Sequence, residues 1–360
     1  MAALIFAVIA CIPDNPGESG PTESAVEHSG ETGETGDSGN PEDCGEPVVT
    51  FVGEDATETD LTAPLLAGTY TTLDAPGTLR VCPGTWFARL LIRADVHVEG
   101  LGSAPEDTVL SAGEQGTILD VMGPDVLLTV QNVTLDRGAG LDVEHNSGGG
   151  GVYCESEGSV LVEDVIFSNN VANDGPGMYV TRCTIDLTRV VFRDNYGEDD
   201  GGALTMWFSE GTLTDVVFEN NEALEGGAVA MFESTFSASG LEIRDNLAHN
   251  FGGGMWIFRS QAELTDTVFE SNVNDGTNGA GLLFNGTGAL TRVDFHDNVG
   301  VRGGGIFLYW ESVLTGEDCD FSGNTPNDIW VADYSDEEGH AVEAGEGYSF
   351  SCAGNECSEQ

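Results

Sequence analysis

The stretch Phe167-Ser-Asn-Asn170 is the first copy of a phrase that the chain repeats seven times, at intervals of 25 or 26 residues. The phrase consists of an aromatic residue or Ile, two further residues and then Asn. Its copies are Phe167-Ser-Asn-Asn170, Phe192-Arg-Asp-Asn195, Phe218-Glu-Asn-Asn221, Ile243-Arg-Asp-Asn246, Phe269-Glu-Ser-Asn272, Phe295-His-Asp-Asn298 and Phe321-Ser-Gly-Asn324. A fixed period of this size indicates stacked supersecondary units.

A group of glycines opens the hydrophobic run between successive phrases. Clear copies are Gly149-Gly-Gly-Val152, Gly201-Gly-Ala-Leu204, Gly226-Gly-Ala-Val229, Gly252-Gly-Gly-Met255 and Gly303-Gly-Gly-Ile306. Weaker copies are Gly175-Pro-Gly-Met178 and Gly279-Ala-Gly-Leu282. Glycine supplies the positive φ that tight corners require, and Asn tolerates the same conformation better than most residues.

Apolar and polar residues alternate before each Phe and again after each glycine group. This alternation predicts short strands with one buried face. The period is too short for a strand and a packed helix with their loops. We therefore expect an all-β protein, a right-handed parallel β-helix with about 25–26 residues per turn and like residues stacked at roughly 4.8 Å. The Asn side chains should stack their amides along the axis.

Charged residues support the same register. Three residues before the Phe position, Asp164, Arg189 and Asp215 alternate in sign, and one residue after it Arg193 and Glu219 do the same. Stacked opposite charges attract by about 0.2–1 kcal/mol per pair, which penalises a slip of one whole turn.

Acidic residues number 62 against 11 basic ones, all of them Arg, for a formal charge of −51. Such a surface repels nucleic acid and anionic lipid, so neither is an expected partner. It could attract divalent cations, but we favour an adaptation to salty surroundings. We expect no metal motif and no cofactor, with weak Ca²⁺ binding open at Glu198-Asp199-Asp200.

The N-terminus reads as an export and anchoring region. Residues 1–10 are apolar and too short to span a bilayer, which is typical of a signal peptide, although this one lacks a basic residue. Residues 11–46 are rich in Gly, Ser, Thr and Glu and should form a disordered acidic tether. We expect the β-helix, with irregular first turns and a cap, over 47–327 and a C-terminal cap over 328–360.

Eight cysteines suggest an oxidising compartment. Cys352 and Cys357 are spaced for a local disulfide. Cys44 and Cys82 could pin the N-terminal cap, whereas Cys154 and Cys319 occupy inward positions, where a free buried Cys behaves as a small hydrophobe. The pairing of Cys44, Cys82, Cys154 and Cys183 stays open.

The paired Phe-x-x-Asn and Gly-Gly-Ala-Val/Leu signatures resemble the repeats of chlamydial polymorphic outer-membrane proteins. They are also similar to pectin lyase-like β-helices of bacterial surface lipoproteins. Val8-Ile9-Ala10-Cys11 resembles the lipobox of such lipoproteins, in which the Cys is acylated. The resemblance implies a lipid-anchored location at the cell outer membrane or cell surface, or an extracellular one, with membrane contact only through a lipid on Cys11. It implies adhesion by analogy alone.

Two functions remain open. Aromatic residues two and four positions after the glycines point outward and predict an apolar strip that could bind a polysaccharide or a cell-envelope protein. The strip comprises Tyr179, Trp207, Phe232, Trp256, Phe258, Phe307 and Tyr309, accompanied by Tyr153. The alternative is a polysaccharide lyase or glycoside hydrolase using Asp199, Asp200 or the turn carboxylates Asp194, Asp245 and Asp297. We favour non-catalytic binding, adhesion or a structural role, and assign no catalytic residue.

Overall fold

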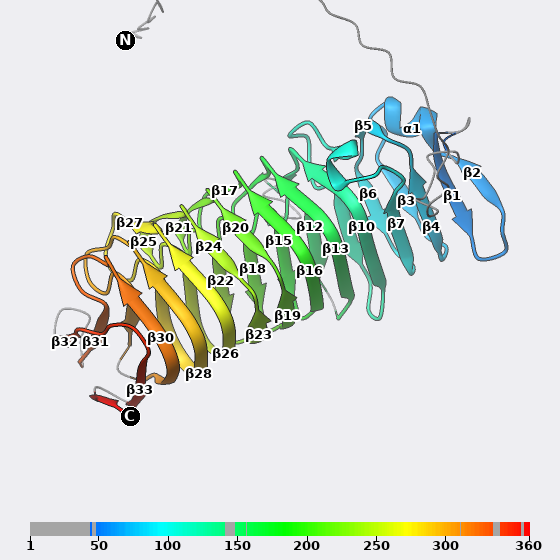
Figure 1. The fold of residues 1–360 in the computed structure, drawn as a ribbon. Coiled ribbons are helices and arrows are strands. Elements are labelled where there is room, and N and C mark those ends of the chain that lie inside the picture. The colour runs from blue at the N-terminus through cyan, green and yellow to red at the C-terminus, as the bar shows by residue number, and fades with distance from the viewer. Residues whose placement is uncertain are drawn as a thin grey trace, which may run out of the picture. The chain divides into compact units, whose positions relative to one another are not determined.

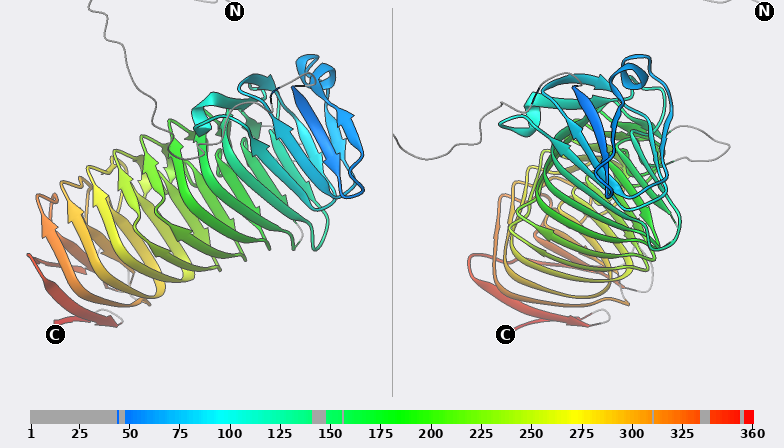
Figure 2. Two further views of the ribbon diagram at one scale, coloured as in Figure 1. Left: turned by 45° about the vertical axis from the view of Figure 1, so that its right-hand side comes forward. Right: turned by 90° about the vertical axis from the view of Figure 1, so that its right-hand side faces the viewer.

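The computed structural model describes residues 44, 48–140, 148–155, 157–309, 311–333, 339–353 and 356–360. Within them the chain winds as a coil of short strands, and each strand pairs in parallel with its counterpart one turn away (Figure 1). Phe167 lies beside Phe192, and Phe192 beside Phe218, which is the register the repeat predicts. Seen nearly along the axis, successive turns overlap in outline (Figure 2).

The first side of the coil is built by the strands that follow the glycine groups, here called the glycine strands. These are β3 (Thr71–Leu73), β6 (Leu90–Ile92), β9 (Leu119–Met122), β12 (Val152–Glu155), β15 (Met178–Thr181), β18 (Leu204–Trp207), β22 (Val229–Phe232), the first parts of β26 (Met255–Glu270) and β28 (Leu282–His296), then β29 (Ile306–Leu308) and β31 (Ile329–Ala332).

The longer strands that carry the Phe position make up the second side. These are β4 (Gly77–Val81), β5 (Gly84–Phe87), β7 (Val96–Gly100), β8 (Thr108–Ser111), β10 (Leu127–Asp136), β13 (Ser159–Ser168), β16 (Thr184–Arg193), β19 (Glu210–Thr214), β20 (Val217–Glu219), β23 (Thr235–Ser239), β24 (Glu242–Arg244), the later parts of β26 and β28, and β30 (Val313–Ser322).

A separate narrow sheet closes each central turn. It is formed by β11 (Ala139–Gly140), β14 (Val171–Ala172), β17 (Tyr196–Gly197), β21 (Glu222–Glu225), β25 (Leu247–Phe251) and β27 (Val273–Asn274).

Two inward columns hold successive turns together. The Phe rings stack, with centroids 4.5 Å apart for Phe167 and Phe192 and 5.0 Å apart for Phe192 and Phe218. The Asn side chains form a buried ladder: the Asn246 Nδ2 group donates to Asn272 Oδ1 at 3.0 Å and to the Phe218 carbonyl at 3.0 Å. Buried amides that satisfy one another fix a unique register.

The charged column occupies a bend with left-handed backbone. Asp164, Arg189 and Asp215 each have φ of 53°, and Gly240 fills the equivalent place with φ of 68°. The Arg189 Nε group donates to Asp164 Oδ1 at 2.7 Å across one turn. Of the ion pairs expected in this column, Arg189 with Asp164 and Arg292 with Asp266 are present. The missing charge at Gly240 is consistent with a position that glycine adopts readily.

Antiparallel strands cover both ends. At the N-terminal end β1 (Val49–Gly53) pairs with β4 and with β2 (Glu58–Asp60), beside α1 (Thr62–Leu66); a 3₁₀ turn over Pro105–Asp107 packs farther along. At the C-terminal end β32 (Gly339–Val342) pairs with β31, and β33 (Tyr348–Ala353) pairs with β30 and with β34 (Glu356–Glu359). These strands run antiparallel to their neighbours, and β2 and β34 are also short and acidic, which discourages further strand pairing.

Three disulfides are present in the described residues. Cys44 pairs with Cys82 at the N-terminal cap, and Cys352 pairs with Cys357 in the last hairpin. Cys154, whose pairing the sequence left open, pairs with Cys183, because these two positions on consecutive turns lie 6.4 Å apart between Cα atoms. Cys319 is free and buried.

The predicted signal peptide over 1–10, the lipidation residue Cys11 and almost all of the tether over 11–46 lie outside the described residues. Among the residues that are described, no helix has the length and apolar character needed to cross a membrane.

Candidate functional site

The outward faces of the glycine strands carry two columns of side chains. Strand pairing aligns the first column, which comprises Asp120, Tyr153, Tyr179, Thr205, Ala230, Trp256, Leu283, Phe307 and Trp330. The second column lies two residues further along each strand and includes Glu155, Thr181, Trp207, Phe232, Phe258 and Asn285. Every residue of the predicted aromatic strip belongs to one of these columns except Tyr309, which directly follows β29.

The strip is not an open apolar stripe. Phe232 is 4% exposed and Phe307 is fully buried, so neither ring can stack on a ligand. Tyr179, Trp207, Trp256, Phe258 and Tyr309 are half-buried. The interpretation of all seven residues as a ligand platform therefore needs correction for Phe232 and Phe307.

Different neighbours explain the burial of the two rings. The rings of Trp207 and Trp256 lie 4.0 and 4.8 Å from the Phe232 ring between centroids, and the glycine corner before β28 covers Phe307. A Cβ on Gly279 would lie 2.9 Å from Leu283 Cβ and 3.2 Å from Phe307 Cβ, so the corner rests directly on the first column. The Phe251 ring packs 5.6 Å from the Trp256 ring between centroids. Leu283, Phe307 and Ala332 thereby form a second small hydrophobic core outside the coil.

The bend after the second column exposes residues that the sequence analysis did not single out. Arg182, Phe208, Glu233 and Arg259 occupy successive turns there with φ between 46° and 56°. Phe208 is 48% exposed, and the Arg182 guanidinium lies 5.7 Å from its ring centroid. A bulky aromatic residue in left-handed backbone is uncommon, and such strain is concentrated at functional sites. The available signal was the pair Trp207-Phe208, which breaks the alternation of its strand.

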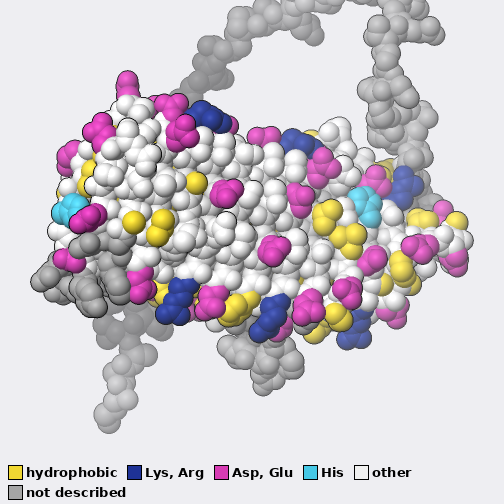
Figure 3. Space-filling model, turned by 90° about the horizontal axis from the view of Figure 1, so that it is seen from below, with side chains coloured by type: hydrophobic (Ala, Val, Ile, Leu, Met, Phe, Trp, Pro, Cys, Tyr) yellow, Lys and Arg dark blue, Asp and Glu magenta, His cyan; other side chains and the backbone are white. Residues whose placement is uncertain are grey.

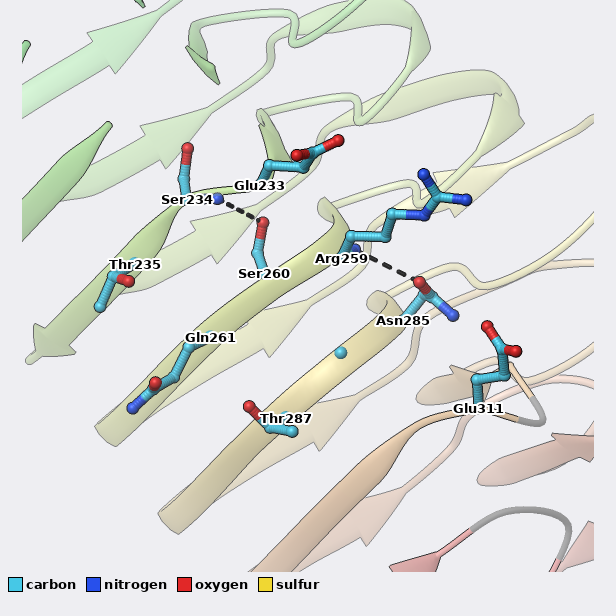
Figure 4. Close-up of a pocket in the computed structure, with 10 residues that line it drawn as sticks. Glu233, Ser234, Thr235, Arg259, Ser260, Gln261, Asn285, Thr287 and Glu311 are labelled. Carbon is cyan, nitrogen blue, oxygen red and sulfur yellow. Dashed lines mark hydrogen bonds between the residues drawn. The ribbon is translucent and has the colours of Figure 1, made fainter. Parts of the chain in front are cut away.

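Serines anchor the bend from within. The Ser209 backbone N–H donates to Ser234 Oγ at 3.0 Å, and the Ser234 N–H donates to Ser260 Oγ at 3.0 Å. On the next turn the Arg259 N–H donates to Asn285 Oδ1 at 3.3 Å. This ladder fixes the backbone that carries Glu233 and Arg259, so their side chains project from a rigid support (Figure 4).

A groove of about 650 Å³ runs along the bend from Glu233 to Glu311. Its wall is formed by side chains that can all make hydrogen bonds, apart from one glycine. The lining residues are Glu233, Ser234, Thr235, Arg259, Ser260, Gln261, Asn285, Gly286, Thr287 and Glu311. Figure 4 shows Arg259 on the turn between Glu233 and Asn285, with Gln261 and Thr287 along the strands that leave the bend.

Arg259 is the cation of this groove. Its guanidinium lies 5.0 Å from the centroid of the Phe258 ring, although Phe258 itself is not one of the residues that line the groove. It forms no ion pair with any carboxylate of the described residues. By contrast, Arg244 pairs with Glu219 and Arg292 pairs with Asp266. The groove therefore offers an available guanidinium beside an aromatic ring.

The carboxylates considered for catalysis fall into two groups. Asp194, Asp245 and Asp297 lie exposed in left-handed positions on alternate turns, with Asn220 and Ser271 at the equivalent positions between them. Asp199 and Asp200 lie in the corner before β18, where the Asp200 N–H donates to Asp174 Oδ1 at 3.2 Å.

Burial and neighbouring carboxylates strongly change the pKa of Asp200. Burial first, then Asp174 and Asp199, raise the pKa of Asp200 to about 8. Burial raises the pKa of Asp174 to about 6, and it also raises the pKa of Glu225 on the next turn. Among the described residues no three His, Cys, Asp or Glu side chains are arranged to hold a metal ion. Weak Ca²⁺ binding at Glu198-Asp199-Asp200 stays a prediction.

Comparison with known proteins supports the fold. Residues 127–298 match the family described as "Right handed beta helix region". The Escherichia coli K12 protein named "Probable autotransporter YfaL" is 34% identical over an alignment of 88 residues, and the match covers 22% of this chain and 7% of that protein. The chain thus matches only a small part of the length of this relative.

Two solved structures share a loose likeness. The surface adhesin PfbA of Streptococcus pneumoniae has 8% identity and a TM-score of 0.25, covering 83% of this chain and 92% of that chain. The catalytic domain of a GH87 α-1,3-glucanase has 11% identity and a TM-score of 0.25, covering 75% and 57%. The family match and the parallel register together confirm the fold expected from the repeat: the chain is a right-handed parallel β-helix.

Proposed function

We propose that this protein is an exported β-helix, displayed at the cell surface or released from the cell, that binds a neutral polysaccharide without cleaving it. The observation that carries the proposal is the bend groove, where the unpaired Arg259 lies beside Phe258 between Glu233 and Glu311. Planar polar side chains that fix orientation, combined with an aromatic ring, are typical of sites that recognise small polar ligands.

The form of the groove favours a polymer. Each turn of the coil contributes one set of side chains to the bend, at a spacing of roughly 4.8 Å. Sugar units in an extended chain recur at a similar length, so successive sugars can meet equivalent positions on successive turns. Phe208 and Arg182 continue the same column beyond the groove.

Charge favours a neutral ligand. Glu233 and Glu311 flank the guanidinium of Arg259, and the whole chain has a formal charge of −51. The face in Figure 3 carries scattered carboxylates with few arginines among them. An anionic polysaccharide would be repelled by this field, whereas hydroxyl groups can donate to the glutamates and accept from the arginine.

The proposed location rests on two observations. Three disulfides suit an oxidising compartment outside the cytosol. The relative in E. coli is named as a probable autotransporter. A lipid on Cys11 would hold the rod at the outer membrane; radiolabelled palmitate should enter the full chain and should not enter Cys11→Ser.

Catalysis is the second candidate, and one observation favours it. Asp200, with a pKa raised to about 8, and Asp174, with a pKa raised to about 6, could each hold a proton near neutral pH, as a general acid must. Asp174 and Asp200 already contact each other, however, and they lie in a corner outside the groove. We therefore assign them no catalytic role.

Affinity electrophoresis of the full chain through gels that contain neutral polysaccharides tests the binding proposal. We expect retardation in at least one gel and a roughly tenfold weaker affinity for Arg259→Ala, which removes a charged hydrogen-bond donor. Arg244→Ala is the matched control, because Arg244 pairs with Glu219 outside the groove. Equal retardation of both variants would contradict the assignment.

A further inference from the structure

The bend that carries the groove becomes one residue shorter at the turn of β28. On earlier turns, one residue in left-handed backbone stands between the second outward column and the serine that anchors the bend. These residues are Phe208, Glu233 and Arg259. Arg259 has no counterpart in β28, because its two neighbours in sequence pair with Asn285 and Gly286, which are adjacent. One side chain is therefore absent between Arg259 and Glu311, the next residue of the groove along the bend.

The place of the absent residue, here called the hollow, is part of the groove. Asn285 and Gly286 line it between Arg259 and Glu311 (Figure 4). A Cβ on Gly286 would lie 2.0 Å from the Ser260 carbonyl oxygen, so no side chain can fill this position unless the backbone moves. Proteins use such one-residue shifts of strand register to redirect side chains beside functional sites.

Two hydrogen-bond donors at the hollow have no partner. Asn285 Oδ1 accepts the Arg259 backbone N–H at 3.3 Å, which leaves the amide nitrogen of Asn285 as a donor. Neither this nitrogen nor the Arg259 guanidinium donates a hydrogen bond to another group in the described part of the chain. Asn285 is 9% exposed and lines the groove, so its amide can meet a ligand although most of the side chain is buried.

Carboxylates stand on both sides of these donors. Glu233 lies on the turn before Arg259, and Glu311 lies on the turn after Asn285. An anion that accepted from the donors would be repelled by the two carboxylates, and a cation would be repelled by Arg259. A neutral amide fits this arrangement, because its carbonyl oxygen accepts two hydrogen bonds and its N–H donates one.

We propose that the hollow takes the acetamido group of an N-acetylhexosamine unit, which makes the groove selective for N-acetylated neutral glycans. The carbonyl oxygen accepts from Asn285 Nδ2 and from Arg259, and the N–H donates to Glu311. The group also matches the gap in kind, because the residue missing from β28 would itself have contributed one planar amide. This inference rests on the proposed function, since it names the sugar that the groove holds.

Isothermal titration calorimetry of the full chain with two hexasaccharides tests the inference. Hexa-N-acetylchitohexaose and cellohexaose are both neutral and β-1,4-linked, and they differ only at carbon 2, which carries an acetamido group in the first and a hydroxyl in the second. We expect the acetylated probe to bind tighter by about tenfold or more, because its carbonyl gains a hydrogen bond from a charged donor.

Two changes at the hollow should remove this preference. Asn285→Asp keeps the oxygen that accepts the Arg259 N–H but replaces the amide donor with a carboxylate oxygen, so the acetylated probe should bind about tenfold more weakly. Asn327→Asp is the matched control, because Asn327 Oδ1 likewise accepts a backbone N–H, from Gly303 at 3.1 Å, outside the groove. Insertion of one Asn between Asn285 and Gly286 restores the residue that β28 lacks and should abolish the preference by filling the hollow.

Equal affinity for the two probes would overturn the acetamido assignment and leave the proposed function in place. Binding of neither hexasaccharide, with retardation in gels of other neutral polysaccharides, would do the same, whereas a lack of both would overturn both proposals. A preference that survives Asn285→Asp and the insertion would place the acetamido group outside the hollow. An N-acetylated tetra-alanine peptide that binds as tightly as the acetylated hexasaccharide would overturn the choice of a saccharide.

Discussion

Inside the coil the same side chain recurs at almost every turn, whereas the outward column of the glycine strands changes its side chain from turn to turn. The inward Asn position is Asn on all seven turns from Asn170 to Asn324. The outward column, in contrast, runs from Asp120 through Tyr153 and Thr205 to Trp256 and Phe307. Both columns are aligned by the same strand pairing.

The difference separates what the fold needs from what it leaves free. A buried amide must meet an identical amide above and below, because any other residue leaves hydrogen-bonding groups unsatisfied. An outward side chain has no such partner and can change without loss of register. Function in this rod should therefore be sought where the repeat breaks, at Phe208 and Arg259.

The largest effect is expected for an inward substitution. Asn246→Ala removes two hydrogen bonds that Asn246 donates and two that it accepts from Asn221, and leaves buried groups unpaired. The free energy of unfolding in urea should fall by roughly 4 kcal/mol. The exposed Asn220, which donates to Asp194, is the matched control, and Asn220→Ala should cost much less. If Asn246→Ala and Asn220→Ala lost similar amounts of unfolding free energy, the claim that inward side chains matter more for stability than outward ones would be wrong.

The buried disulfide should come next. Replacing Cys154 and Cys183 together with Ala opens a bridge between residues 29 apart in sequence and should lower the unfolding free energy by about 3 kcal/mol. Cys319→Ala also removes a buried sulfur, although it opens no loop. The loss of unfolding free energy in the double variant and in Cys319→Ala can be compared by calorimetry. If the double variant loses no more than twice as much as Cys319→Ala, the disulfide contributes nothing beyond packing.

Substitution of the outward Asp200 should raise, and not lower, the free energy of unfolding at alkaline pH. Because burial and neighbouring carboxylates raise the pKa of Asp200 to about 8, the folded state binds this proton more tightly than the unfolded state does. The free energy of unfolding should therefore decrease as pH rises from about 4 through about 8. Asp200→Asn should reduce that decrease and be more stable than the parent at about pH 9, by more than about 1 kcal/mol. Parallel pH profiles for the two proteins would show that Asp200 is not the cause.

The smallest effect on stability is expected at Phe208. Phe208→Asn replaces an aromatic residue at φ of 49° with one that tolerates left-handed backbone, so the unfolding free energy should be unchanged or rise by less than about 1 kcal/mol. The variant should nevertheless be retarded less in gels that contain polysaccharide, because the Phe208 ring is 48% exposed beside the groove column. A variant that keeps full affinity would place Phe208 outside the binding face.

The inward half of the molecule could be predicted from the sequence because each inward column repeats its chemistry. The spacing of Phe167, Phe192 and Phe218 established the period, and the alternation around it gave the strands. The first turns, from Val49 to about Asp136, lack the repeat, so only their β character could be predicted. The pairing of Cys154 with Cys183 was missed because inward position alone does not distinguish a free thiol from one with a partner on the next turn.

The outward half could be predicted only in part. Alternation showed that Phe232 and Phe307 point away from the core. It could not show that neighbouring rings cover Phe232 or that the Gly279 corner of the preceding turn covers Phe307. The groove at Arg259 depends on where the backbone bends, and the bend is marked by Ser234 and Ser260, whose role becomes visible only once their hydrogen bonds are known. Likewise, Tyr70 and Asp120 are 50 residues apart in sequence and meet only through the coil.

The central claim is that the rod binds a neutral polysaccharide on its variable outer side and leaves the polymer intact. The most direct test incubates the full chain with insoluble neutral polysaccharides and follows, in one sample, both co-sedimentation of the protein and release of new reducing ends. We predict co-sedimentation without new ends, and its loss in the double variant Phe208→Asn, Arg259→Ala at an unchanged melting temperature. New reducing ends that disappear in Asp200→Asn, or a double variant that sediments as fully as the parent, would contradict the account.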